Sequence, residues 1–513
     1  MKYKLLPLVL GIVAFAYYVV LSSKSFTWLY TSADSADWLV IANWWMVPQP
    51  LGSPLFLLLC QAISHLPGNL LINMTVLLSC LPSAISVSFV YLITKQLTGK
   101  VHLSVISSLI LLGSMTFLTQ STVLELYAIT TMFLTISLFF LSKKRMKLFY
   151  LFLGFGAAVH SSIFIVTFII TLIILLRGKT LINLRRLIRP VMVFIVSGIL
   201  PYSLILLLMH LDTPRFFAGP LDWYHLNGYF IGIANSVVGT ISVFDFPQRI
   251  LSFSSILISS LFLSLIPLVH SLRRPYDEVK LILISVVGFY MWYYLTCFDP
   301  ATWPYLIMAF PAIAIMVGVY GLTEGSIKGS IRVLKRSITV FKGSGTTLIK
   351  LVTVSSIVLI ILNGVFMNAN TLTNQNPVAT TLERELIALP EDSVVVTLPG
   401  ATTMTVLYVM SKGKYIVPLM VGPVEYGFKG YQDYLRTEYG IVGDNIQALA
   451  KDAESKSRRL YLIEVKYFEE EQCFILLEIP GNKYVKEITG FTEYLPSYYH
   501  SVISTPGYNY LQP

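Results

Sequence analysis

The chain has 513 residues, of which 55% are hydrophobic and only 12% are charged. An ordinary soluble domain carries about twice that charged fraction, so the composition excludes a typical water-soluble protein. Repeated apolar runs of about 18 or more residues indicate a protein that crosses a membrane many times. The formal net charge of +10 says little by itself, because its distribution along the chain carries the information.

The charge balance changes near residue 368. From Asn368 onward there are 12 Lys and Arg residues against 17 Asp and Glu, whereas the first 367 residues hold 25 basic and 10 acidic ones. This change predicts a membrane domain over residues 1–367 and a polar α/β domain over residues 368–513. In the polar domain we expect helices at Thr381–Leu389 and Asn445–Ser455, and strands at Ser393–Leu398, Tyr415–Met420, Arg459–Val465 and Cys473–Ile479.

The membrane domain is expected to hold eleven spans. Their approximate bounds are Leu5–Leu21, Leu70–Leu92, His102–Phe117, Val123–Leu141, Leu148–His160, Ser161–Leu176, Val191–Leu208, Ile250–His270, Leu281–Cys297, Trp303–Leu322 and Leu348–Phe366. One further apolar segment, Ser53–His65, is too short to cross a hydrocarbon core of about 30 Å. We therefore expect it to form a helix that lies on the membrane surface.

Basic residues indicate the orientation of these spans. The first span follows Lys2 and Lys4 and is typical of an uncleaved signal anchor. With the N-terminus in the cytoplasm, only Lys24, Arg215 and Arg249 of the membrane domain fall on the other side, as the positive-inside rule predicts. The C-terminal domain then lies outside. We expect a multi-pass protein of a prokaryotic cell (plasma) membrane, or of the endoplasmic reticulum membrane in a eukaryote.

The first outer loop, residues 22–69, contains two carboxylates, Asp34 and Asp37, ahead of an aromatic segment. Acids next to a membrane are costly and often functional. Their spacing of three residues places both on one face if the segment is helical. Capping of a helix over Asp37–Trp45 explains the same residues, so both interpretations stay open at this point.

The loop also resembles a known family. Residues Asp34-Ser35-Ala36-Asp37-Trp38, followed by Gln49-Pro50-Leu51-Gly52-Ser53-Pro54-Leu55, are similar to the D-S-G-E-F … H-P-P-G-Y-P-L signature of the DUF2723 family. This family comprises protein O-mannosyltransferase-like members of the GT-C glycosyltransferase superfamily. Glu125-Leu126-Tyr127-Ala128 resembles its E-V-Y-A motif, and Gly154–His160 resembles its G-L-x-x-G-N-H segment.

The resemblance covers about residues 25–320 and has three departures. Gln49 stands where the family usually has His, Asp37 replaces Glu, and Val159 replaces the Asn before His160. The resemblance implies a GT-C-like fold in which an acid of the first outer loop is essential. It also implies inverting transfer of a hexose such as mannose from a polyprenyl-phosphate carrier to a protein, glycan or lipid acceptor outside the cell. Nucleic acid is not an expected partner.

Such a transfer needs a base that accepts the proton of the acceptor hydroxyl. By its matching position Asp34 is expected to be this general base, with Asp37 orienting the acceptor or sharing the role. A cation would stabilise the departing lipid phosphate. The expected substrate-binding residues are Gln49, Glu125, Tyr127, His160, Arg215, Asp222, His225 and Arg249.

Four of these residues, Glu125, His160, Arg215 and Arg249, also have a structural interpretation. The arginines are also explained as anchors at lipid headgroups, and Glu125 and His160 as partners in structural hydrogen bonds. The four cysteines, Cys60, Cys80, Cys297 and Cys473, lack the spacing of metal ligands, and we expect no metal and no cofactor. A divalent ion stays an open alternative.

Two other functions compete with glycosyl transfer. A lipid or glycan transporter or flippase would favour charges at mid-membrane depth and two pseudo-symmetric halves, and the sequence shows neither. The other alternative is an inactive GT-C-like assembly protein whose C-terminal domain carries the function.

Overall fold

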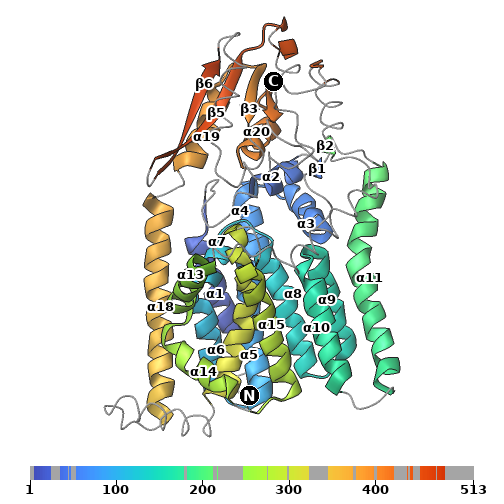
Figure 1. The fold of residues 1–513 in the computed structure, drawn as a ribbon, viewed down its shortest axis with the longest axis vertical. Coiled ribbons are helices and arrows are strands. Elements are labelled where there is room, and N and C mark those ends of the chain that lie inside the picture. The colour runs from blue at the N-terminus through green and yellow to red at the C-terminus, as the bar shows by residue number, and fades with distance from the viewer. Residues whose placement is uncertain are drawn as a thin grey trace.

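A computed structural model gives the fold of the chain. It describes residues 5–24, 35–43, 46–47, 53–177, 182–211, 216–217, 246–273, 275–296, 300–322, 345–373, 377–397, 401–420, 436, 440–442, 451–453, 455–468 and 471–479. A bundle of helices occupies the lower part of Figure 1, and a small sheet with its helices lies above one end of the bundle.

Apolar helices form the bundle. In chain order they are α1 (Leu6–Leu21), α4 (Leu70–Thr75), the π-helical turn η2 (Val76–Cys80), α5 (Leu81–Thr98), α6 (Val101–Gly113), α7 (Met115–Thr122), α8 (Tyr127–Ser142), α9 (Met146–Val159), α10 (Ser162–Arg177), α11 (Ile182–Leu211), α13 (Phe246–Leu261), η3 (Phe262–Ser264), α14 (Leu265–Leu272), α15 (Glu278–Thr296), η4 (Pro300–Ala309), α16 (Phe310–Met316), η5 (Val317–Gly321) and α18 (Gly345–Thr373). Helices α11 and α18 lie at opposite sides of the bundle in Figure 1.

Six helical runs of the described part are long and apolar enough to cross a membrane, and a seventh results if α6 and α7 form one bent span. Helices α1, α8, α9 and α10 are shorter apolar helices. Each of the eleven expected spans coincides with one of these helical runs. How many of them cross the membrane stays a prediction.

Helix α7 corrects the prediction around Phe117. The sequence suggested a span that ends there, whereas the helix already breaks at Ser114, and α7 leaves α6 at an angle of 64°. The Ser114 hydroxyl accepts a hydrogen bond from the Phe117 backbone N–H at 3.3 Å and so caps α7. The last residues of α7, Thr119-Gln120-Ser121-Thr122, are polar yet buried, which hides this helix from a hydrophobicity pattern.

The C-terminal part forms a four-stranded mixed sheet in the order β4-β3-β5-β6. Strand β3 (Ser393–Thr397) pairs in parallel with β4 (Ile416–Met420) and β5 (Leu460–Phe468), and β5 pairs antiparallel with β6 (Glu471–Ile479). Two helices, α19 (Pro377–Ala388) and α20 (Ala401–Ser411), accompany the sheet. The four expected strands and the first expected helix are confirmed, but α20 was not predicted. Of the helix expected at Asn445–Ser455, the structure describes only residues 451–453 and Ser455, and all four of these residues are helical.

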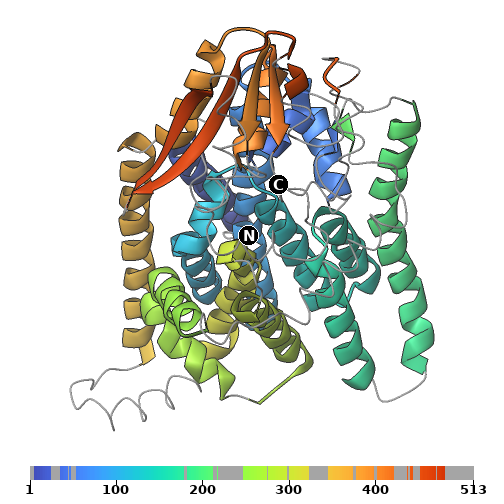
Figure 2. The same cartoon turned by 45° about the horizontal axis from the view of Figure 1, so that its top comes forward.

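This α/β part lies next to the first loop of the chain. Helix α2 (Ser35–Asn43) packs against α20, and the Asn43 side-chain amide donates a hydrogen bond to the Ser411 hydroxyl at 3.0 Å. Helix α3 (Pro54–Ser64), where the surface helix was expected, packs against α2. Figures 1 and 2 show α2 and α3 between the bundle and the sheet. The first loop and the C-terminal part therefore share one end of the bundle.

Candidate functional site

Helix α2 carries the second of the two expected catalytic acids. It begins at Ser35, so Asp37 is the third residue of the helix and lies in its first turn. This corrects the interpretation of Asp37 as a cap, because a capping residue precedes the first turn. Asp34, the expected general base, lies outside the described residues.

Apolar contacts fix α2 in place. Residues Leu39, Val40 and Ile41 are almost fully buried. The ring of Trp38 meets that of Phe56 in α3 edge-on, with centroids 4.7 Å apart, and the Gln61 side chain of α3 donates a hydrogen bond to the carbonyl of Ile41. The helix that follows Asp34 is therefore held between α3 and the C-terminal helix α20.

A short pairing joins two loops that are far apart in the sequence. Strand β1 (Met46–Val47), in the first outer loop, pairs in parallel with β2 (Phe216–Phe217), which follows α11. Gln49 is two residues after β1, and Arg215 immediately precedes β2. The side chains of Gln49, Arg215, Asp222 and His225 lie outside the described residues. The pairing nevertheless brings the backbone of the two loops that contain these residues together.

Glu125 lies between α7 and α8 with only 1% of its surface exposed. Ser79, in the π-helical turn η2, contacts its backbone. The Ser79 hydroxyl accepts a hydrogen bond from the Glu125 N–H at 3.3 Å and donates one to the Glu125 carbonyl at 3.4 Å. A single π-helical turn within an α-helix often marks a functional position. The distorted helix therefore positions a buried carboxyl group two residues before Tyr127.

Tyr127 and His160 meet in an aromatic cluster centred on Tyr305. The Tyr305 ring contacts those of His160 at 4.9 Å, Tyr127 at 5.1 Å and Tyr293 at 4.9 Å between centroids, in each case nearly perpendicular. The rings of Tyr127 and His160 lie 5.8 Å apart. His160 and Tyr305 stay partly exposed, whereas Tyr127 and Tyr293 are buried. Two of the expected substrate-binding residues are thus in direct contact.

His160 precedes α10 and its imidazole accepts the hydrogen bond that caps this helix. Its Nδ1 accepts from the Ser162 backbone N–H at 3.2 Å and also lies 2.8 Å from the Ser162 hydroxyl oxygen. That hydroxyl lies 3.2 Å from the hydroxyl of Tyr290, which is fully buried in α15. The imidazole is therefore held by the start of α10 and, through Ser162, by α15.

The cations expected near the outer face contact helix ends. Arg249 donates a hydrogen bond to the Tyr294 carbonyl in the last turns of α15 at 3.0 Å. Lys24 donates to the Val19 carbonyl near the end of α1 at 2.7 Å. Positive charge is favourable at the C-terminal end of a helix. Both contacts give these side chains a structural role at helix ends.

Sequence reasoning missed Ser79, Ser162, Tyr290, Tyr293 and Tyr305. Each lies in or next to an apolar run, where serine and tyrosine are common and give no periodic signal. The only sign of this aromatic cluster in the sequence was a tyrosine-rich stretch, Tyr290-Met291-Trp292-Tyr293-Tyr294. Only the packing of α15 and η4 against α8 and α10 assigns these side chains to one cluster.

No protein-family model and no curated protein matches the chain. Two solved structures of ArnT from Cupriavidus metallidurans resemble it. The first, with undecaprenyl phosphate bound, has a TM-score of 0.59 and 11% identity over 93% of this chain and 98% of that chain. The second, in the apo state, has the same TM-score and identity over 89% of this chain and 92% of that chain.

This likeness extends over nearly the whole length of both chains and concerns the fold. Together with the apolar helices it supports a multi-pass membrane protein that shares the fold of ArnT, as expected for a GT-C-like fold. The expectation of a GT-C fold is therefore confirmed.

Proposed function

We propose that the protein is a membrane glycosyltransferase that takes a sugar from a polyprenyl-phosphate carrier. One observation carries the proposal: the fold matches ArnT over 93% of this chain, and that ArnT structure has undecaprenyl phosphate bound. Because the match covers 93% of this chain, both the bundle and the C-terminal part contribute to it.

The proposed chemistry is a single displacement with inversion. Asp34 is the general base for the acceptor hydroxyl, and Asp37 orients the acceptor or shares this role. Their place next to α2 supports this assignment, because α2 lies between the bundle and the C-terminal part. We further propose a DUF2723-like enzyme that transfers a hexose such as mannose, with its site and its C-terminal domain outside the cell and its N-terminus in the cytoplasm.

The cluster around Tyr305 supports a sugar-binding role for Glu125, Tyr127 and His160. Aromatic rings and neutral hydrogen-bonding groups suit a ring that carries hydroxyls, and Glu125 is close to Tyr127 in sequence. Arg215 is proposed to contact the lipid phosphate, since β2 next to it pairs with the first outer loop. Arg249 already donates to the end of α15. A phosphate contact by Arg249 is a weaker proposal.

Reconstitution in liposomes separates transfer from transport. Undecaprenyl-phosphate mannose with a radiolabelled sugar would be supplied in the membrane together with bacterial membrane proteins and glycans as acceptors. A glycosyltransferase moves the label from the lipid fraction to the acceptor fraction. A flippase leaves the label on the lipid and moves it to the other leaflet, where an added mannosidase detects it. An inactive assembly protein does neither, and both of the last two results would contradict the proposal.

A further inference from the structure

The backbone of α10 determines which nitrogen of His160 carries a proton. A backbone N–H can only donate, and that of Ser162 points to Nδ1 at 3.2 Å. Nδ1 must therefore offer its lone pair. In a neutral imidazole the other nitrogen, Nε2, then carries the hydrogen. The capping geometry of one helix thus selects one tautomer.

Tyr290 strengthens this selection through Ser162. Because Nδ1 is an acceptor, the Ser162 hydroxyl at 2.8 Å has to donate to it. The hydroxyl oxygen is then available to accept from the Tyr290 hydroxyl at 3.2 Å. The hydrogen bonds run in one direction, from Tyr290 to Ser162 to His160. A protonated Nδ1 would conflict with the Ser162 backbone N–H, which can only donate.

Nε2 stays available for a ligand. The residue as a whole is partly exposed, and within the described part of the chain Nε2 has no hydrogen-bond partner. The rings of Tyr127 and Tyr305 lie beside it. A neutral N–H donor beside aromatic rings suits a sugar, because sugars pack their C–H groups on aromatic faces and bind through directed hydrogen bonds from their hydroxyls.

The start of α10 does not suit a phosphate ligand. Helix N-termini bind phosphate through free backbone N–H groups. Here the N–H of Ser162 is occupied by Nδ1, that of Ile163 donates to the His160 carbonyl at 3.2 Å, and that of Phe164 donates to the Ser161 carbonyl at 2.9 Å. The first turn therefore lacks the available N–H groups that a phosphate site needs.

We propose that His160 donates a hydrogen bond from Nε2 to a hydroxyl of the donor's sugar ring, and that Tyr290 is a positioning residue that maintains this tautomer through Ser162. The inference rests on the proposed function for its ligand and on the geometry of α10 for its tautomer. It assigns the sugar, rather than the lipid phosphate, to the cluster around Tyr305.

A pair of substitutions separates this role from simple capping. His160→Asn keeps an oxygen that accepts from the Ser162 N–H, and Asn is a favourable capping residue, but it places no donor at the Nε2 position. His160→Gln places its amide nitrogen near the Nε2 position at the expense of the cap. Tyr290→Phe removes the hydroxyl that orients Ser162. Tyr150→Phe is its matched control, because the Tyr150 hydroxyl contacts the hydroxyl of Thr171 at 2.8 Å elsewhere in the bundle.

Two binding probes identify the contacted group: undecaprenyl phosphate, and undecaprenyl-phosphate mannose. We expect His160→Asn to keep the affinity for undecaprenyl phosphate and to weaken that for the mannosylated lipid about tenfold, the effect of one lost hydrogen bond. His160→Gln should recover part of this loss. Tyr290→Phe should weaken binding of the mannosylated lipid several-fold, and Tyr150→Phe should not. Equal losses for both lipids would assign the contact to phosphate, and unchanged binding by His160→Asn would leave only the cap; either result overturns the proposal.

The tautomer can be measured without any ligand. Nitrogen NMR of histidine-labelled wild-type protein, with the His160 signals assigned by their absence in His160→Asn, should show an unprotonated Nδ1 and a protonated Nε2. Tyr290→Phe should broaden or shift the Nδ1 signal. A protonated Nδ1 would overturn the inference. Wild-type protein that binds neither lipid would contradict the proposed function and the sugar contact together, and the NMR result would still decide the tautomer.

Discussion

Ser79 and Glu125 are joined through both backbone groups of the glutamate. One hydroxyl accepts from its N–H at 3.3 Å and donates to its carbonyl at 3.4 Å, although the two residues belong to different helical runs. The backbone at Glu125 therefore cannot move away from η2 without breaking these two hydrogen bonds. The π-helical turn and the buried carboxyl group form one structural unit.

Ser79→Ala should disturb this unit. The loss of two long hydrogen bonds should lower the free energy of unfolding by only about 1 kcal/mol, while sugar transfer falls more strongly because Glu125 moves. Ser86→Ala is the matched control: Ser86 is also fully buried, but its hydroxyl donates only within its own helix, to the Pro82 carbonyl at 3.0 Å. Transfer rates and thermal unfolding of both variants test this. Equal effects on transfer would argue against a positioning role for Ser79.

Glu125→Gln should separate activity from stability. The substitution keeps the size of the side chain and replaces a carboxyl group that is 1% exposed by an amide that cannot ionise. Burying a carboxylate costs free energy, so the variant should be at least as stable as the wild type. If Glu125 contacts sugar or acceptor, transfer should fall at least tenfold. A variant with unchanged transfer and a lower unfolding temperature would indicate a purely structural carboxylate.

Gly154 allows α9 and α11 to approach closely. A Cβ atom there would lie 1.9 Å from the Ser197 hydroxyl and 2.6 Å from the Phe194 carbonyl oxygen. Gly154→Ala should therefore push the helices apart and destabilise the protein by about 1–3 kcal/mol, as overpacking does. At Gly156, on the same helix, the nearest atom to such a Cβ lies at 3.4 Å. Gly156→Ala should be tolerated, and unfolding in detergent compares the two; equal destabilisation would contradict this packing.

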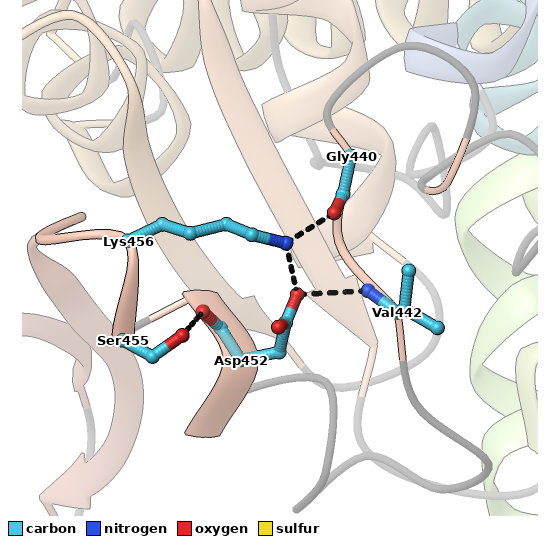
Figure 3. A network of polar contacts seen from close by, with 5 residues as sticks. All are labelled: Gly440, Val442, Asp452, Ser455 and Lys456. Atoms are coloured by element: carbon cyan, nitrogen blue, oxygen red, sulfur yellow. Dashed lines mark hydrogen bonds and ion pairs between the residues drawn. The ribbon is translucent and has the colours of Figure 1, made fainter.

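A network in the C-terminal part should be sensitive to acid. Asp452 accepts hydrogen bonds from Lys456 at 2.5 Å and from the Val442 N–H at 2.9 Å, and Lys456 also donates to the Gly440 carbonyl (Figure 3). The Lys456 contact, followed by the Val442 N–H, lowers the pKa of the Asp452 carboxyl below its ordinary value.

A lowered pKa in the folded state means that the carboxylate stabilises this segment above the ordinary Asp pKa, near 4, and that this contribution is lost as the pH falls further. Asp452→Asn should therefore speed amide exchange around Val442 at pH 7, and the difference from the wild type should shrink below about pH 4. Ser455→Ala, which removes only a hydrogen bond to the Asp452 carbonyl, is the control. A difference that persists unchanged in acid would contradict the assignment.

Much of the fold could be predicted from apolar runs. Every expected span coincides with a helical run. A helix that is surrounded by lipid and a helix that is buried in protein both need a long apolar segment, so the same sequence pattern predicts both. Helix α7 was not predicted because its last four residues are polar although they are buried. The hydroxyls of Thr119, Ser121 and Thr122 donate hydrogen bonds to backbone carbonyls of the same helix. Helix α20 was not predicted because Ala401–Ser411 mixes threonines with apolar residues that are common in both strands and helices.

The candidate site could be predicted only in part. Short motifs identified Tyr127 and His160, and the structure brings their rings together. Tyr305 and Tyr290 contribute through tertiary contacts between helices that are distant in sequence, and no local pattern encodes such contacts. The role of Asp34 rests on the family resemblance, and it stays a prediction.

The most direct test compares transfer of labelled mannose from undecaprenyl-phosphate mannose by the wild type and by Asp34→Asn, at equal folded yield. Asp392→Asn is the control, because it makes the same chemical change at an exposed residue whose positive φ of 64° suits Asn. We expect wild type and Asp392→Asn to label the acceptor and Asp34→Asn to leave the label on the lipid. Equal labelling by Asp34→Asn would remove Asp34 from the reaction, and an unlabelled acceptor with all three proteins would contradict transfer from this donor.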